Sequence, residues 1–433
     1  MRIYSQTDNY ILYEGSMLDL GEVIADNSID SIVTDPPYEL NFMGKGWDRS
    51  GIAFSPETWR RCYNALKPGG HLLAFGGSRT FHRIAVAIED AGFEIRDVIL
   101  WLYGSGFPKS LNIGLAIDKK NGVDNRTGNL RTDGVGSNSG TGVYNLNDAE
   151  NTPVATVYEE RVALNEWRGW GTSLKPAYEP IIVARKPCAS SCIDNVLTYG
   201  VGGINIDECR IDHDEPVKYT TRTTEKSNGL HMGKFKSTGS ERSTANPAGR
   251  FPSNVLLTYD DTDRAEVCGG MPETKSSSPI ASDNRANIGN SMFIDGVHTP
   301  GNSYNDEGSA SRYFYTAKAS PRDRDEGLEV LASRNIHPSV KPTDLMQYLV
   351  RLVTPRGGTV LDPFNGSGST GKACMFENKD RDANYKYIGI ELTPEYLPIA
   401  EARIKFAARY TDEITEEQQK GQLSIFDILG GAS

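Results

Sequence analysis

The sequence predicts an α/β fold in which helices cover both faces of a parallel β-sheet. The first observation is an alternation of apolar strands and amphipathic helices near the start, at 29–34, 55–67, 71–75, 78–91 and 93–103. The second is the return of this alternation near the end, at 343–352, 359–361, 387–391 and 393–409. Such alternation is typical of βαβ units, so both segments are predicted to build one sheet.

Residues that start or stop helices set the ends of these elements. Ser55-Pro56 supplies an N-cap hydroxyl and a proline suited to a first turn, and the Pro-Gly-Gly run at 68–70 is predicted to close that helix. Thr343 caps a helix whose apolar residues repeat at helical spacing, and Thr393-Pro394 opens the last helix. A further short strand is expected within 9–20.

Two irregular regions interrupt the alternation. Gly, Asn, Ser, Thr and Asp dominate 122–153, which has few apolar residues and is predicted to be a flexible insert. The second region, 188–335, is polar over long stretches and holds one clear strand at 254–259. We therefore expect the sheet to be interrupted by an inserted region between its two parts.

Composition limits the class of protein. A net charge of -11 and a pI near 5.2 argue against indiscriminate binding of polyanions. The chain has no apolar run of 18 residues, its start lacks the features of a secretory signal, and its six cysteines are too few for a disulfide framework. We expect a reduced, cytoplasmic protein without a membrane segment. Its cysteines lack paired Cys-x-x-Cys spacing, so no metal site is predicted, with a metal knuckle as the weaker alternative.

Two motifs follow predicted strands at opposite ends of the chain. Asp35-Pro36-Pro37-Tyr38 follows the strand 29–34, and the glycine-rich run from Asp362 to Thr370 follows the strand 359–361. Glycines at a strand-to-helix turn let the backbone approach a ligand closely. Because ligands bind outside the carboxyl ends of parallel strands, we expect both motifs to contribute to one bipartite site.

The first motif suits methyl transfer to an exocyclic amine. The lone pair of an aromatic amine is delocalised into its ring, so the amine needs acceptors for its two hydrogens before it can attack a sulfonium methyl group. The Asp35 carboxylate and the Pro36 carbonyl offer these acceptors, and Tyr38 offers a flat face for the base. Acceleration would come from positioning and electrostatics, without a covalent intermediate or a catalytic cysteine. A base in a duplex must be flipped out to reach such a pocket.

The second motif is followed, about 20 residues later, by Glu391 at the end of a predicted strand. An acidic residue at that place suits recognition of ribose hydroxyls. In isolation, the glycine run also fits the nucleotide turn of a dehydrogenase, Asp35-Pro36-Pro37-Tyr38 also fits an ordinary turn, and Glu391 also fits a surface carboxylate.

Together these motifs resemble the beta class of DNA amino-methyltransferases, which modify adenine N6 or cytosine N4. In that class the Pro-Pro-Tyr motif precedes the cofactor motif, in a circularly permuted order, and the target-recognition region lies between them. The matching segments are 15–19, 35–38, 71–77, 178–186, 337–342, 362–370 and 389–391. The run 35–48 is most similar to phage and prophage enzymes.

The resemblance implies a Rossmann-like S-adenosylmethionine-dependent methyltransferase sheet with an inserted target-recognition region. It implies that Asp35, Pro36, Pro37 and Tyr38 are catalytic. It implies S-adenosylmethionine contacts from Asp19, Lys341, Asp362, Phe364, Gly366, Ser367, Gly368, Thr370 and Glu391. The implied regions are a first catalytic half at 1–187, a target-recognition region at 188–335, a cofactor-binding half at 336–410 and a tail at 411–433.

The sequence favours adenine as the target base, because Asp before the two prolines is commoner in the adenine enzymes. Cytosine N4 is the first alternative, since cytosine enzymes usually carry Ser at that position. Methylation of RNA or of a protein glutamine is less favoured, because those families usually place the glycine motif first. A catalytically dead accessory protein that binds DNA or a clamp is the alternative from another class, but neither motif is degraded.

Two further segments suggest partners. Between 218 and 250 there are seven Lys and Arg residues against two Glu, which fits contacts with double-stranded DNA as well as it fits a solvated loop. The candidate contacts are Lys218, Arg222, Lys234, Lys236 and Arg242. The tail segment Gln422 to Asp427 resembles the peptide by which replication proteins dock on the bacterial sliding clamp, although it also fits packing on its own domain. A homodimer is left open.

Overall fold

The computed structural model describes most of the chain. The described residues are 1–40, 46–104, 110–131, 158–211, 218–222, 240–244, 249–259, 267–268, 271–275, 307–318, 322–331 and 334–409. By its internal contacts the chain divides into two compact units, one made of Met1–Gly104 with Tyr178–Ser433 and the other of Ser105–Ala177.

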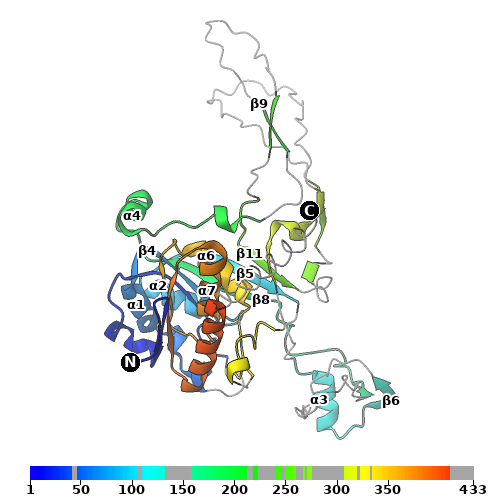
Figure 1. Cartoon of the computed structure of the whole chain (residues 1–433). Helices are drawn as coiled ribbons and strands as arrows, with labels where there is room; N and C mark the ends of the chain where they lie inside the picture. Colours follow the sequence, from blue (N-terminus) through cyan, green and yellow to red (C-terminus); the bar gives the residue numbers. More distant parts are fainter. Residues whose placement is uncertain are drawn as a thin grey trace, which may run out of the picture. The chain divides into compact units, whose positions relative to one another are not determined.

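Within the described residues, a ten-stranded sheet forms the centre of the first unit (Figure 1). In spatial order its strands are β1 (Arg2–Gln6), β2 (Tyr10–Glu14), β16 (Lys386–Glu391), β15 (Thr359–Asp362), β3 (Ile29–Thr34), β4 (Leu66–Phe75), β8 (Tyr178–Arg185), β5 (Glu94–Tyr103), β11 (Val255–Tyr259) and β14 (Tyr315–Lys318). The two end segments of the chain meet at the centre, where β15 pairs with β3 in parallel. The predicted α/β fold is confirmed.

The sheet is mixed rather than wholly parallel. Strand β1 pairs antiparallel with β2, and β8 runs antiparallel to both of its neighbours, β4 and β5. Hydrophobic patterning predicts that a strand is buried but carries no information on its direction, so the expectation of a parallel sheet was wrong for β8. Strand β1 was not predicted from the sequence. Strand β4 also begins earlier than predicted, because the 68–70 segment that was expected to close a helix is extended and belongs to the strand.

Helices cover both faces of the sheet. Helices α1 (Pro56–Ala65) and α2 (Phe81–Asp90) bury apolar residues in one core cluster, whereas α6 (Thr343–Val353), α7 (Ser369–Arg381) and the helix at 397–409 bury theirs in another. In α1 the buried stripe includes Trp59, whose indole N–H donates to the Ala53 carbonyl at 2.9 Å. Burying such side chains stabilises the fold by roughly 1.5–3 kcal/mol each.

The remaining elements are short. Helix α4 (Cys192–Tyr199) packs on β4. The 3-10 helices are Met17–Glu22, Gly46–Arg49, Ile52–Phe54, Asp207–Cys209, Ala310–Tyr313, Glu329–Leu331 and Pro394–Tyr396. The second unit contains α3 (Ile113–Lys120) and the paired strands β6 (Arg126–Arg131) and β7 (Tyr158–Arg161). Two further antiparallel pairs join β9 (Lys218–Arg222) to β10 (Ser240–Thr244) and β12 (Glu273–Lys275) to β13 (Glu307–Ser309).

The inserted region contributes to the sheet itself. Strands β11 and β14 lie within 188–335, yet they extend the central sheet in parallel beside β5. Most of the insert predicted at 122–153 lies outside the described residues. The limits proposed for the target-recognition region stay a prediction.

The antiparallel direction of β8 determines which of its residues lie at the edge of the sheet that carries the two motifs. Parallel strands β3, β4, β15 and β16 all end at one edge of the sheet, and an antiparallel strand inserted among them begins at that same edge. The Gly76 amide, just past the end of β4, donates to the Pro180 carbonyl at 2.9 Å. Glu179, next to Pro180, is therefore placed beside the carboxyl ends of the parallel strands.

Candidate active site

The structure brings the two sequence motifs to one edge of the sheet. Strands β3 and β15 are neighbours and end at Thr34 and Asp362, so the segments that follow them lie side by side. The Thr34 hydroxyl donates to Asp362 Oδ1 at 2.6 Å, which ties the two strand ends together. The bipartite site expected from the sequence therefore has the geometry that such a site needs.

Only one of the two carboxylate oxygens of Asp35 has a hydrogen-bond partner. Its Oδ2 accepts a hydrogen bond from Lys341 Nζ at 2.7 Å. Its Oδ1 is buried and has no hydrogen-bond partner in the structure. A buried acceptor without a partner is costly, so this oxygen is available for a donor that arrives with a ligand.

Glu179 connects the aromatic residues of this edge, and the sequence analysis did not single it out. Its Oε2 accepts from the Tyr38 hydroxyl at 2.7 Å and lies 3.4 Å from Lys341 Nζ. Its Oε1 accepts from the Tyr103 hydroxyl at 3.3 Å. Three elements are thus joined, the segment after β3, the end of β5 and the start of β8.

This environment shifts the pKa values of the groups in it. Burial, together with the Asp35 and Glu179 carboxylates, raises the pKa of Tyr38 well above its usual range. Burial alone would lower the pKa of Lys341, but the Asp35 and Glu179 carboxylates outweigh it and raise that pKa above its ordinary value. Tyr38 is therefore a neutral donor and Lys341 a cation throughout the physiological range.

The Tyr38 backbone is also held. Its carbonyl accepts from the Thr80 hydroxyl at 2.8 Å, just before α2 begins. Positions 41–45, which follow in the phage-like run, lie outside the described residues.

The glycine turn between β15 and α7 needs its glycines. Gly366 and Gly368 have φ values of 50° and 74°, in the left-handed region. A Cβ on Gly368 would come within 2.9 Å of the Ala400 Cα atom, and one on Gly366 within 2.9 Å of His337 Nε2. The Gly368 position is thus required by the close approach of the helix at 397–409 as well as by its backbone conformation.

Glu391 supports the same turn. Its Oε2 accepts from the Gly366 amide at 2.7 Å and its Oε1 from the Thr393 amide at 2.8 Å. Burial outweighs these bonds and raises the pKa of Glu391 to about 7. The Glu391 carbonyl accepts from the Gly15 amide at 3.0 Å, two residues before the 3-10 helix Met17–Glu22, which carries the exposed Asp19.

Asp362 and Thr370 lie under the turn rather than on its surface. Both are buried, and the Thr370 hydroxyl donates to Asp362 Oδ2 at 2.7 Å. Burial raises the pKa of Asp362 to about 6, although its hydrogen bonds from Thr34 and Thr370 oppose that shift. In this structure these two predicted cofactor contacts join β3, β15 and α7.

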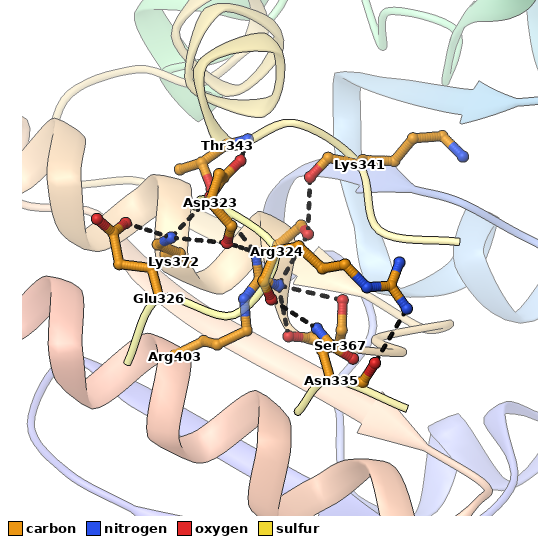
Figure 2. Close-up of polar contacts among 10 residues, drawn as sticks. Asp323, Arg324, Glu326, Asn335, Lys341, Thr343, Ser367, Lys372 and Arg403 are labelled. Carbon is orange, nitrogen blue, oxygen red and sulfur yellow. Dashed lines mark hydrogen bonds and ion pairs between the residues drawn. The ribbon is translucent and has the colours of Figure 1, made fainter. Parts of the chain in front are cut away.

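A second polar cluster lies behind the turn (Figure 2). Lys372 Nζ contacts Asp323 Oδ1 at 2.7 Å and Glu326 Oε2 at 2.8 Å. Arg403 Nη1 donates to the Ser367 carbonyl at 2.8 Å, which holds the glycine turn from the side of the last helix. No motif marks Asp323, which lies in the polar inserted region.

Figure 2 also shows how this cluster meets the Lys341 segment. Asp323 Oδ2 accepts from the Thr343 amide at 2.7 Å, and the Ser369 hydroxyl donates to the Lys341 carbonyl at 3.0 Å. The Lys341 side chain points away from the cluster. The cluster therefore fixes the backbone that presents Lys341 without contacting its ammonium group.

His337 is a structural neighbour of the turn. Its Nδ1 donates to the Ser339 carbonyl at 2.6 Å, and its ring lies against Tyr396 with centroids 4.6 Å apart. Burial lowers the pKa of His337 to about 4, so the ring is neutral at physiological pH.

The predicted DNA contacts are only partly described. Lys218 and Arg222 lie on β9 and Arg242 lies on β10, which pair as a hairpin. Lys234, Lys236 and the tail segment from Gln422 to Asp427 lie outside the described residues, so DNA contact, clamp docking and a homodimer stay predictions.

The described part of the chain lacks two features, a membrane-spanning helix and a cluster of metal ligands. It contains no helix long and apolar enough to cross a membrane. It also contains no cluster of three or more potential metal ligands from His, Cys, Asp and Glu.

Comparison with known proteins identifies the family. The family model described as DNA methylase, for N6 and N4 amino-methyltransferases, matches residues 29–402. The chain belongs to this family. It is a family of S-adenosylmethionine-dependent enzymes, and its N6 and N4 names cover adenine and cytosine targets alike.

Individual relatives match over shorter segments. The type II methyltransferase M.Cfr9I of Citrobacter freundii is 31% identical over 106 residues, which are 22% of this chain and 33% of the relative. The DNA adenine methyltransferase YhdJ of Escherichia coli is 34% identical over 77 residues, 18% of this chain and 24% of the relative. The matched segments thus span between 24% and 48% of the length of the first curated relatives. The solved PvuII DNA methyltransferase, described as cytosine-N4-specific, covers 95% of each chain at 14% identity with a TM-score of 0.44.

The edge of the sheet fits the cofactor of this family. Each Glu391 oxygen accepts one amide hydrogen, which leaves further acceptor capacity for ribose hydroxyls beside the partly buried Gly366. The unpartnered Asp35 Oδ1 offers an acceptor on the neighbouring strand end.

Proposed function

We propose that this protein is a site-specific DNA methyltransferase that modifies the exocyclic amine of adenine. The observation that carries the proposal is the buried, unpartnered Oδ1 of Asp35, on a strand end adjacent to the glycine turn. When bound, S-adenosylmethionine supplies an electrophilic sulfonium methyl group. Glu391, the turn around Gly366 and the exposed Asp19 would hold the cofactor.

The residues after β3 would perform the substrate half of the reaction. Asp35 Oδ1 and the Pro36 carbonyl would accept the two hydrogens of the target amine, which directs its lone pair outward for in-line attack. Tyr38, held by Glu179, would stack on the base after it has left the duplex. The Asp35 carboxylate is a suitable acceptor for the proton that the amine releases.

Adenine is proposed over cytosine because an aspartate, not a serine, precedes the two prolines. Membership of the DNA methylase family supports DNA as the substrate, with contacts proposed from Lys218, Arg222, Lys234, Lys236 and Arg242. Cytosine N4 is the second candidate, since the family includes both activities.

Methylation-sensitive sequencing of DNA from cells expressing the protein, with mass spectrometry of digested nucleosides, tests the proposal. N6-methyladenine at one short sequence is expected, and it should disappear when Asp35→Asn is expressed instead. Only N4-methylcytosine would move the assignment to the second candidate. No methylated base in DNA would refute the function.

A further inference from the structure

The ammonium group of Lys341 is enclosed by groups of the substrate side. Its side chain is 7% exposed, and Nζ contacts Asp35 Oδ2 at 2.7 Å and Glu179 Oε2 at 3.4 Å. The ring centroids of Phe75 and Tyr38 lie 5.0 and 5.3 Å from it. Two carboxylates and two aromatic rings thus surround one cation, which is the environment that a buried lysine needs.

Resting on the proposed function, we propose that Lys341 and Glu179 are positioning residues for the target base. Lys341 holds Asp35 Oδ2 so that Oδ1 faces the amine, and Glu179 holds both Lys341 and the Tyr38 ring. This role differs from the contact with S-adenosylmethionine that the family resemblance implies for Lys341.

The geometry of a carboxylate supports the role of Lys341. Fixing one oxygen at 2.7 Å fixes the rotation of the group and hence the direction of the other oxygen. That other oxygen is the buried Oδ1 without a partner. Preorganising such an acceptor before substrate arrives removes a reorganisation cost from the chemical step.

Glu179 extends the same control to the stacking surface. The Tyr38 hydroxyl donates to Glu179 Oε2, the same oxygen that faces Lys341, and Tyr103 occupies Oε1. The acceptor for the amine and the ring for the base are therefore set by one chain of contacts, Asp35 to Lys341 to Glu179 to Tyr38.

A matched control pair exists at the other end of the same strand. Lys67 Nζ contacts Asp30 Oδ1 at 2.6 Å, and Asp30 Oδ2 accepts from the Thr359 amide at 2.8 Å. Here both oxygens are occupied, and the pair lies at the amino end of β3, away from the site. Lys67→Met and Lys341→Met remove the same charge from a lysine–aspartate pair, although the Lys67 side chain is 28% exposed and that of Lys341 only 7%.

The experiment compares these variants in the full-length protein, on the duplex sequence that sequencing identifies. Calorimetry measures S-adenosylmethionine affinity, rapid quench measures single-turnover methyl transfer at saturating cofactor, and 2-aminopurine fluorescence reports extrusion of the target base. For Lys341→Met we expect cofactor affinity within about threefold of wild type and transfer slower by about 100-fold or more. For Lys67→Met we expect both to stay within about twofold of wild type.

Glu179→Gln tests the second half of the chain and keeps the shape of the side chain. We expect cofactor affinity to be retained, the 2-aminopurine signal to change because Tyr38 is less constrained, and transfer to slow by about tenfold. This variant also covers the case in which Lys341→Met does not fold, which its thermal unfolding would show.

Different outcomes separate this inference from the proposed function. If Lys341→Met weakens cofactor binding and saturating cofactor restores the rate, Lys341 is a cofactor ligand and the inference fails while the function stands. Unchanged transfer in both Lys341→Met and Glu179→Gln also refutes it. If the wild-type protein transfers no methyl group to DNA, the proposed function itself fails.

Discussion

Two buried lysines, Lys341 and Lys372, sit in similar surroundings and lead to different conclusions. Each contacts two carboxylates, and each is at most 7% exposed. Both oxygens of Asp323 beside Lys372 are occupied, by Lys372 and by Thr343. Asp35 beside Lys341 keeps one buried oxygen without a partner.

The occupancy of the carboxylate oxygens distinguishes an ion cluster that only stabilises the fold from one that can take part in the reaction. A buried charge costs free energy unless ions and hydrogen bonds compensate it, so a cluster serving only stability is expected to use its carboxylate oxygens fully. In the Lys372 cluster the buried carboxylate, Asp323, has both oxygens occupied, and the cluster joins α7 to the segment around Asp323. The Lys341 cluster leaves an acceptor unused at the edge where substrate would arrive.

The largest effect is expected on methyl transfer when Asp35, the carboxylate beside Lys341, is replaced. Asp35→Asn keeps the shape of the side chain but replaces one acceptor oxygen by a donor. We expect methyl transfer to slow by about 1,000-fold, about 4 kcal/mol of transition-state stabilisation, with cofactor affinity nearly unchanged. Single-turnover transfer and calorimetric titration measure the two quantities. Transfer at the wild-type rate would remove Asp35 from the chemistry.

A smaller effect, on stability, is expected at the other lysine. Lys372→Met leaves Asp323 buried with less compensation, and we expect the free energy of unfolding to fall by about 3 kcal/mol. The estimate is at the lower end for a broken buried pair because Glu326 is 38% exposed. Urea unfolding measures it. Lys405→Met, which breaks the partly exposed pair with Glu401, is the control and should cost about 0.5 kcal/mol or less.

These two outcomes together test the distinction. If Lys372→Met impairs transfer at temperatures where the variant is fully folded, the Lys372 cluster belongs to the chemistry after all. If it changes neither stability nor activity, its compensation of Asp323 is unimportant.

The next smaller effect is a dependence of the free energy of unfolding on pH, which arises from Glu391. Burial raises its pKa from 4.5 to about 7, so the folded protein binds this proton more tightly than the unfolded chain. The contribution of this group to the free energy of unfolding is fully present below about pH 4.5, and it is lost as the pH rises through about 7. Between about pH 5 and about pH 7.5 the free energy of unfolding should fall by about 2 kcal/mol from this group.

Asp362 contributes in the same direction, because burial raises its pKa to about 6. Glu391→Gln should therefore reduce the fall with pH without abolishing it, as followed by urea midpoints at several pH values. Glu395→Gln, at an exposed position of the 3-10 helix Pro394–Tyr396, is the matched control for the loss of one carboxylate near the end of β16. Equal slopes in wild type and Glu391→Gln would contradict the assignment.

The sequence predicted which residues lie at the carboxyl ends of the parallel strands, and there is a physical reason for this. Strand ends, glycine turns and the residues just after them are local features, and Asp35, Tyr38, Gly366 and Glu391 all lie at the edge where the alternation of strands and helices puts them. A parallel arrangement of β3, β15 and β16 is enough to bring them together.

The residues that sequence reasoning missed depend on long-range geometry. Glu179 reaches the site only because β8 is antiparallel, which no local pattern reveals. Asp323 lies in a polar stretch without periodicity, yet it compensates Lys372 across 49 positions of sequence. The contact from Lys341 to Asp35 spans 306 positions. One signal was available, since the run around Glu179 reads as a turn followed by a buried strand with a carboxylate at its start.

The smallest effect on methyl transfer is expected from loss of the hydrogen bond between the Tyr103 hydroxyl and Glu179. Tyr103→Phe removes a hydroxyl that donates to Oε1 at 3.3 Å, whereas Tyr38→Phe removes one that donates to Oε2 at 2.7 Å. A long bond contributes less, so Tyr103→Phe should reduce single-turnover transfer by about threefold, near 0.6 kcal/mol, and Tyr38→Phe by more. Because Glu179 keeps Lys341 and Tyr38 in the first variant, the line of contacts to Asp35 stays intact. If the two variants lose equal activity, Glu179 acts through both tyrosines alike, and the substrate-side cluster is broader than the chain from Asp35 to Tyr38.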